Sequence, residues 1–231
     1  MGAARRHFAG NRRLALKRVS AKIGDNFPAI ELPTPAFEDV LSLGEAFQRR
    51  ETRRVFAPTP LPLDKLSELL WAACGVNRKI GPFGLTGRTD ATASNSQEID
   101  VYVAMEMGVY LYDPDRLRLA PILIGDVRPL ALDRSQTPAG DRAPVRLIYV
   151  ADVDRLEHSQ GQDEPGLHDA ETQKAYYYVD CGIVAANVYL YAAGAGLNAW
   201  FHTCDRAALA KRLPLRAGRR VLFAQTVGFP G

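Results

Sequence analysis

Three residues at alternating positions, Arg50, Thr52 and Arg54, could together bind an anionic or oxygen-rich ligand. They follow a helical pattern and precede a proline-rich break, and alternate side chains of an extended segment emerge on one face. Two guanidinium groups and a hydroxyl on one face suit a phosphate, because guanidinium forms paired, charge-assisted hydrogen bonds with it. The simpler alternative is a solvated basic helix end, which the helix dipole would favour.

A second candidate is the stretch 88–97, which is dense in short hydroxyl and amide side chains. It lies directly before a β-type apolar run, and such groups can hydrogen-bond a polar ring or a polyhydroxylated chain. The alternative is an ordinary turn rich in Ser, Thr and Asn.

A glycine-containing helix end near 194–197 leads into a short strand and forms the third candidate. Backbone N–H groups that follow this strand could approach a cofactor. The alternative is a glycine helix cap followed by a core strand. The chain has neither a GxGxxG that opens a helix nor a GxxxxGKS or GxxxxGKT motif, which excludes a Rossmann dinucleotide site and a P-loop.

The cysteines and histidines show no metal-binding spacing. Cys74, Cys181 and Cys204 lie far apart without a CxxC pair, and the four histidines form no HExxH motif. We therefore expect free thiols in a reducing cytoplasm, and no metal site.

The elements that must position these groups can be read from the hydrophobic pattern. The alternation of strands and helices predicts an α+β or α/β fold with a central sheet. Residues 75–97 are expected to form a long functional loop and residues 155–171 a surface loop. Helices are predicted at 38–50, from 64 onward, at 172–195 and at 205–213, and strands at 99–104, 108–112, 145–151, 198–202 and 220–227.

Length and composition fit one large domain, 37–231, because the 231 residues are 47% hydrophobic and can bury a core. It follows a basic arm and a proline-rich extended lead-in, 1–36. Seven of the 29 basic residues lie in 1–24, where no acidic residue occurs, so the pI of 8.8 reflects the arm. We expect no nucleic-acid partner and no membrane span. The charges of the arm interrupt the apolar region that an export signal needs.

Five stretches, taken together and in order, resemble the nitroreductase family. The closest branch looks like the SagB-type dehydrogenases and their small single-domain relatives. The resemblance implies an α+β fold with a central, mainly antiparallel sheet flanked by helices. It also implies an intertwined homodimer with two FMN sites at its interface. The stretches are RETRRVF (50–56), LSELLWAACGVNR (66–78), RTDATASNSQEIDVYVAMEMGVYLYD (88–113), DCGIVAANVYLYAAGAGLNAW (180–200) and VLFAQTVGFP (221–230).

The first stretch resembles the family's Arg-x-Ser-x-Arg/Lys motif, with threonine in place of serine. This implies that Arg50 binds the FMN phosphate and that Thr52 takes the serine position. Arg54 would lie near the flavin N1/O2 edge, where a cation stabilises the anionic reduced flavin. Many members carry a further basic residue soon after a final Val-Gly-x-Pro, and the sequence reaches only Gly231, one residue beyond that motif.

The family's Pro-Ser-x-x-Asn loop would come from the second subunit. Here it reads Ala91-Thr92-Ala93-Ser94-Asn95, with the proline lost, the serine replaced by threonine and the asparagine kept. The resemblance also implies that a backbone N–H of Thr203 or Cys204 lies near flavin N5, with Cys204 acting through its backbone and not its thiol.

These features predict an FMN-dependent oxidoreductase that works by a ping-pong transfer from NAD(P)H to a small nitroaromatic or quinone-like acceptor. The flavin would carry the chemistry, with no catalytic side chain, and Arg54 would tune it. One alternative is a SagB-type dehydrogenase of a peptide-derived substrate. Azoline-forming relatives carry an adjacent Lys-Tyr pair, however, and here Ala175 separates Lys174 from Tyr176. The other alternative is a protein that binds flavin without turnover, or whose basic arm docks on an anionic partner.

Overall fold

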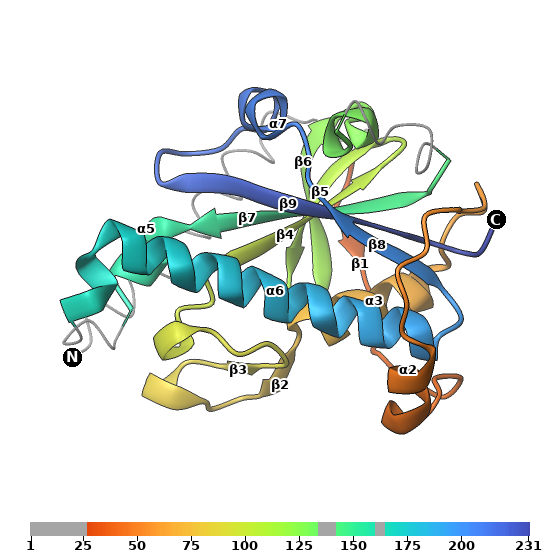
Figure 1. Cartoon of the computed structure of the whole chain (residues 1–231), viewed down its shortest axis with the longest axis horizontal. Coiled ribbons are helices and arrows are strands. Elements are labelled where there is room, and N and C mark those ends of the chain that lie inside the picture. The colour runs from red at the N-terminus through yellow and green to blue at the C-terminus, as the bar shows by residue number, and fades with distance from the viewer. Residues whose placement is uncertain (1–26, 134–141, 160–164) are drawn as a thin grey trace.

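A seven-stranded sheet forms the centre of the computed structural model, which describes residues 27–133, 142–159 and 165–231 (Figure 1). Its order is β1-β6-β5-β4-β7-β9-β8, and every neighbouring pair is antiparallel, as expected. The strands are β1 (Ile30–Glu31), β4 (Ile99–Met105), β5 (Gly108–Asp113), β6 (Arg118–Ile124), β7 (Val145–Asp152), β8 (Asn198–His202) and β9 (Arg219–Gly228).

Helices lie on both faces of this sheet, which gives the expected α+β arrangement. The long helix α6 and the helix α3 lie together on one face, and α7 lies on the other (Figure 1). The helices are α2 (Leu43–Arg49), α3 (Leu63–Cys74), α5 (Val153–Glu157), α6 (Ala170–Gly194) and α7 (Arg206–Arg212). Short 3-10 turns are η1 (Pro82–Gly84), η2 (Ala93–Asn95), η3 (Arg128–Ala131) and η4 (Pro165–His168).

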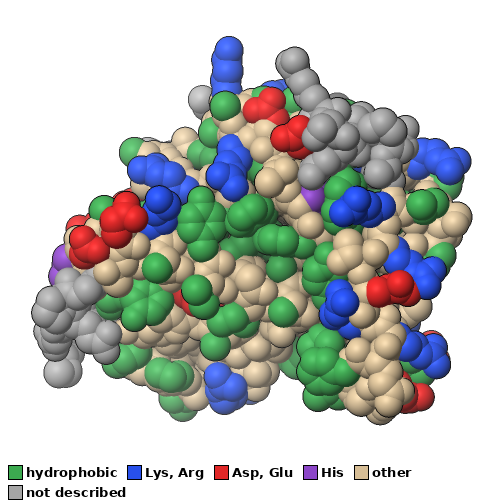
Figure 2. Space-filling view, viewed as in Figure 1, with side chains coloured by type: hydrophobic (Ala, Val, Ile, Leu, Met, Phe, Trp, Pro, Cys, Tyr) green, Lys and Arg blue, Asp and Glu red, His purple; other side chains and the backbone are tan. Residues whose placement is uncertain are grey.

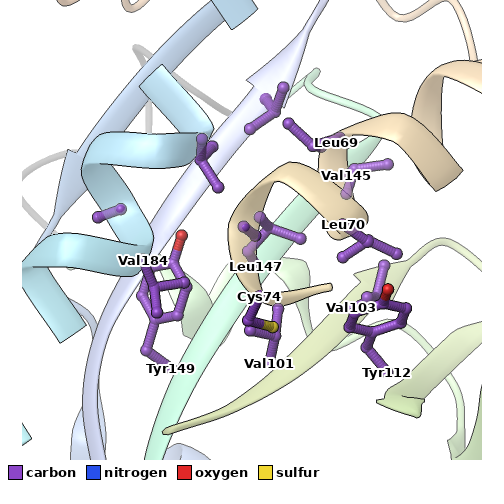
Figure 3. Close-up of a cluster of buried hydrophobic side chains, with 14 of the residues drawn as sticks. Leu69, Leu70, Cys74, Val101, Val103, Tyr112, Val145, Leu147, Tyr149 and Val184 are labelled. Atoms are coloured by element: carbon purple, nitrogen blue, oxygen red, sulfur yellow. The ribbon is translucent and has the colours of Figure 1, made fainter. Parts of the chain in front are cut away.

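The core has two parts because successive strand residues point to opposite faces. In β4, Val101 and Val103 enter the cluster under α3 and α6, whereas Tyr102 and Ala104 enter the cluster under α7. Figure 3 shows part of the first cluster, in which labelled side chains from α3, α6, β4, β5 and β7 converge. The helix α3 contributes the buried stripe expected from the sequence, and Leu69 and Leu70 are fully buried.

The helix predicted at 38–50 begins later than expected, at Leu43. Ser42 and Glu45 form a capping box, in which the Ser42 hydroxyl accepts from the Glu45 N–H and the Glu45 carboxylate accepts from the Ser42 N–H. Such a box fixes the helix start, because it satisfies N–H groups that the helix leaves unpaired. Leu43 and Phe47 face solvent, each 62% exposed.

Two segments expected to be loops contain regular structure. Residues 75–97 form a hairpin of β2 (Val76–Arg78) and β3 (Gly87–Arg88), followed by the turn η2. Within 155–171, the end of α5 and the turn η4 lie among the described residues. The strand β6 was not predicted.

The expected glycine cap ends α6. Gly196 has a φ of +70°, a conformation that favours glycine, and the Leu197 N–H donates to the Ala192 carbonyl at 2.8 Å. β8 begins at Asn198, two residues after Gly196, so the cap connects α6 directly to the edge strand of the sheet.

Within the described part of the chain, no helix is both long and apolar enough to cross a membrane. The same residues hold no group of three or more His, Cys, Asp or Glu side chains that could bind a metal. Cys74, Cys181 and Cys204 are buried free thiols. Residues 1–26, which include all seven basic residues of the arm, lie outside the described residues. The lead-in that follows carries β1.

Candidate functional site

The segment after α2, residues 50–55, runs beside the edge strand β8; we call it the arginine segment. The Arg53 N–H donates to the Ala199 carbonyl at 3.1 Å, and the Asn198 side-chain amide donates to the Val55 carbonyl at 2.7 Å. Farther along, Phe56 bridges to Pro230. These contacts keep the segment extended beside β8 and α6, and Figure 2 shows Lys and Arg side chains gathered on this side of the molecule.

Three side chains of the arginine segment lie against aromatic residues of α6 and β8. Arg50 lies over the Tyr189 ring at 5.6 Å, and the Thr52 hydroxyl lies 3.1 Å from the Tyr189 hydroxyl. Arg54 lies over the Trp200 ring at 5.2 Å. Between them, Glu51 and Arg53 pair with each other at 2.5 Å and do not join this row. Two guanidinium groups and one hydroxyl are therefore exposed along the segment, with Arg50 and Thr52 on Tyr189 of α6 and Arg54 on Trp200 of β8; we call these three side chains the exposed row.

The second predicted site, residues 91–97, forms a tight polar loop. The Ala93 N–H donates to Asp180 of α6 at 3.0 Å, and the Thr92 hydroxyl accepts from the Gln97 N–H at 3.0 Å. Ser94, Asn95 and Gln97 all have positive φ values near 50°, which non-glycine residues seldom adopt. Such strain gathers at functional sites, because the surrounding contacts must hold it in place.

Asn95 uses its side chain inside the molecule. Its amide N–H groups donate to the carbonyls of Pro82 and Thr86, each at 3.3 Å, and its oxygen accepts from Gln97 at 3.1 Å. Gln97 also donates to Thr86 at 2.6 Å. The polar loop is thus tied to the β2–β3 hairpin.

The tip of that hairpin carries three exposed apolar side chains. Ile80 is 81%, Phe83 44% and Leu85 39% exposed. Phe83 also has a positive φ of 57°, an unusual conformation for a bulky residue. The hairpin therefore holds apolar surface at a fixed position next to the polar loop.

Two buried acids, Glu98 and Asp180, accept hydrogen bonds from the polar loop. Glu98 is fully buried, accepts from the Ser96 hydroxyl at 2.6 Å and lies beside Asp180, which is 3% exposed. Burial, reinforced by the Asp180 charge, raises the pKa of Glu98 to about 8. Burial also raises the pKa of Asp180 and of the neighbouring Asp90. Glu98 is therefore mostly protonated at neutral pH, which lets two carboxyl groups share this space.

The third predicted site follows β8. Thr203 is exposed and Cys204 is buried, and burial raises the pKa of the Cys204 thiol to about 11. His202 fixes the carbonyl of Thr203, to which its Nδ1 donates at 2.8 Å, while its Nε2 accepts from the Thr226 hydroxyl at 2.8 Å. Burial lowers the pKa of His202 to about 4, so the ring is neutral. Neither the Cys204 thiol nor the His202 ring titrates near neutral pH, which favours a role for the backbone N–H groups of Thr203 and Cys204.

Within one chain, α6 separates the arginine segment from the polar loop. The first contacts Tyr189 and the second contacts Asp180, nine residues earlier, which corresponds to about 13 Å along a helix. The arginine segment lies along β8, the strand that leads to Thr203 and Cys204.

Three residues of this site were not found from the sequence: Tyr189, Asp180 and Glu98. A signal existed for Asp180, which is the one charged residue between Lys174 and Asp205. Tyr189 carried no comparable signal, because several tyrosines occur along the same helix.

Comparisons with known proteins show which family the chain belongs to. The sequence model of the Nitroreductase family matches residues 46–229. A protein of Methanocaldococcus jannaschii that bears the name nitroreductase is 30% identical over 176 residues, covering 73% of this chain and 81% of that protein. A crystal structure from Ralstonia eutropha JMP134, also described as a nitroreductase, is 34% identical with a TM-score of 0.74 and covers 90% of this chain and 92% of that one.

A more distant similarity concerns the fold alone. A chain of the Escherichia coli microcin synthetase McbBCD complex is 16% identical with a TM-score of 0.59, covering 87% of this chain and 77% of that one. The family match, the relative and the fold lead to one conclusion: this chain belongs to the nitroreductase family of flavin-binding oxidoreductases.

Proposed function

We propose that the chain is an FMN-dependent oxidoreductase that takes reducing equivalents from NAD(P)H and passes them to a small nitroaromatic or quinone-like acceptor. The observation that carries this proposal is the exposed row of Arg50, Thr52 and Arg54 beside β8 in a nitroreductase chain. When bound, FMN supplies the hydride and electron chemistry. The protein supplies binding, orientation and electrostatic tuning.

The side chains present fit such a group. The guanidinium of Arg50 suits a phosphate, and Thr52 offers a hydroxyl beside it. Arg54 supplies a cation for the ring edge that becomes anionic on reduction. After β8, a backbone N–H of Thr203 or Cys204 would face the reacting edge, and the protonated Cys204 thiol leaves that role to the backbone.

We further propose a homodimer in which the polar loop of one chain completes the site of the other. Two observations support it. The loop and the arginine segment occupy separate stretches of α6, so each chain presents half of a site. Apolar side chains are also exposed: Val179 on α6 is 60% exposed, and Leu43 and Phe47 lie on α2. Figure 2 shows apolar side chains spread along the middle of the face where α6 runs.

The acceptor is proposed to bind beside the hairpin tip. Ile80, Phe83 and Leu85 give the surface next to the polar loop an apolar character, which suits a flat apolar acceptor. A peptide-processing role has less support, because Lys174 is exposed and pairs with Glu171 at 3.9 Å. The buried free thiols fit a reducing cytoplasm.

The test is an absorbance spectrum of the purified protein with the cofactor identified by mass, followed by NAD(P)H oxidation with and without acceptor. We expect bands near ~450 nm from FMN, one FMN per chain, and oxidation that depends on acceptor. Arg50→Ala should weaken FMN binding roughly 10- to 100-fold, because one charge-assisted contact is lost. Arg53→Ala is the matched control, since Arg53 pairs with Glu51 outside the row. Protein that takes up no FMN on reconstitution would refute the assignment.

Mixed dimers test whether the sites are shared. Ala93→Pro removes the N–H that donates to Asp180 and should impair the polar loop. Neither Arg50→Ala nor Ala93→Pro homodimers should bind FMN well. A heterodimer of the two variants should regain one intact site, built from the unaltered arginine segment of one chain and the unaltered loop of the other. No recovery in the heterodimer would mean that each site lies within a single chain.

A further inference from the structure

Tyr189 contacts two of the three residues in the exposed row. Its ring lies under the Arg50 guanidinium at 5.6 Å, and its hydroxyl lies 3.1 Å from the Thr52 hydroxyl. The same hydroxyl lies 2.8 Å from the backbone nitrogen of Phe201 in β8. One side chain of α6 therefore joins the arginine segment to the strand that leads to Thr203.

The direction of one of these hydrogen bonds follows from the chemistry of the groups. A backbone N–H can only donate, so the Tyr189 oxygen accepts from Phe201. Between Tyr189 and Thr52 either hydroxyl can donate, because each oxygen also has lone pairs that accept. When Tyr189 donates its one proton to Thr52, the proton of Thr52 is left for a group outside the protein.

We propose that Tyr189 is a positioning residue that makes Thr52 a hydrogen-bond donor toward the bound cofactor. The inference rests on the proposed function for the identity of that cofactor. It specifies the ligand atom opposite Thr52 as an acceptor, such as a phosphate oxygen, a carbonyl oxygen or an unprotonated ring nitrogen.

The strand end of this relay can be tested in protein free of flavin. Tyr189→Phe keeps the ring under Arg50 and removes the hydroxyl. Amide hydrogen exchange at Phe201 should become roughly fivefold faster, because one hydrogen bond of typical strength is lost. Thr52→Val should leave exchange at Phe201 within about twofold, since that variant removes the acceptor of Tyr189 and not its donor. Tyr178→Phe, whose ring packs on Phe223 of β9, is the control on the same helix.

The ligand end is tested by FMN binding in a double-mutant cycle. Tyr189→Phe should weaken FMN binding roughly three- to tenfold when residue 52 is Thr or Ser, both of which carry a hydroxyl. In the Thr52→Val background the same change should have no further effect. Equal effects in all three backgrounds would overturn the positioning role.

The two proposals fail in different ways. If the unaltered protein binds no FMN, the proposed function fails, and the exchange rate at Phe201 still decides whether Tyr189 holds β8. If FMN binds and Tyr189→Phe leaves both the exchange rate and the affinity unchanged, the relay is overturned while the function stands.

Discussion

An Arg155→Met protein is expected to be less stable than the unaltered chain by about 3–5 kcal/mol, because it leaves two buried carboxylates with one paired arginine in place of two. For a chain of this size, the melting temperature should fall by roughly 10 °C. The measurement is a thermal or urea melt followed by circular dichroism.

The reason is a network of four charges that joins β4, β7, α5 and β9. Arg155 contacts Asp100 at 2.5 Å and Asp152 at 2.8 Å, and Arg219 contacts the same two carboxylates. Asp100 and Asp152 are 4% and 6% exposed. Arg155 also donates to the backbone carbonyl of Glu98 at 3.2 Å. Removal of Arg155 leaves Arg219 as the remaining arginine that bridges both acids.

Lys174→Met is the control for this change. Lys174 and Glu171 are 52% and 84% exposed and lie 3.9 Å apart, so their pairing is screened by water. The melting temperature should change by at most about 2 °C. If Arg155→Met melts as close to the unaltered protein as the control does, the buried network does not stabilise the fold.

Between pH 6.5 and pH 8, the stability of a Glu98→Gln protein is expected to fall much less than that of the unaltered protein. The pKa of Glu98 is about 8 in the fold, against an ordinary value of 4.5. Folded protein therefore holds a proton that unfolded protein has released, and stability falls as pH rises between these values. The whole window is worth on the order of 4 kcal/mol. Glutamine has nearly the same shape and no proton to lose.

The informative range lies between pH 6.5 and pH 8. His202 acts in the opposite sense, because its pKa falls from 6.5 to about 4, so it costs stability as pH drops below 6.5. Between pH 6.5 and pH 8, ionisation of Glu98 should lower stability by roughly 1 to 2 kcal/mol. Burial also raises the pKa of Asp180 and of Asp90, so their ionisation lowers stability with rising pH in the same sense as Glu98. The positive charge of Arg155 reduces the rise in the pKa of Asp90.

Urea melts at several pH values within this range provide the measurement. Glu45→Gln is the control, because the hydrogen bonds of Ser42 lower the pKa of Glu45 and keep it ionised throughout the range. That variant should change the level of stability and keep its slope with pH. If stability falls with pH as steeply in Glu98→Gln as in the unaltered protein, Glu98 does not hold a proton in the folded state. Glu98 ionises beside Asp180, which accepts from the Ala93 N–H of the polar loop. We therefore also expect binding of the proposed FMN cofactor to weaken over the same pH range.

Much of the fold could be predicted from local pattern. Strands β4, β5, β7, β8 and β9 have β-branched or aromatic runs, and the structure places each within two residues of its expected bounds. The strand β6 was missed because Pro121 argues against a strand. It is tolerated because the pairing with β5 shifts register there, and β1 pairs only with Leu119 and Arg118.

The site was predictable where it depends on neighbours in sequence. The segment 50–55 is extended, as predicted, and Arg50 and Thr52 contact the same tyrosine, whereas Arg54 contacts Trp200 of β8. The contact of Thr52 with Tyr189 spans 137 residues, and that of Ala93 with Asp180 spans 87. Such contacts are set by how α6 crosses the sheet, which no local pattern contains.

The position of β9 in the sheet bears on how the protein is made. β9 lies between β7 and β8, both of which precede it in the chain. As synthesis proceeds, β8 emerges without a partner in the sheet, and β7 keeps an open edge that invites mispairing. The sheet can close only after β9 has left the ribosome. Because β8 carries the contacts of the arginine segment, the site proposed for FMN can form only after β9 has been synthesised.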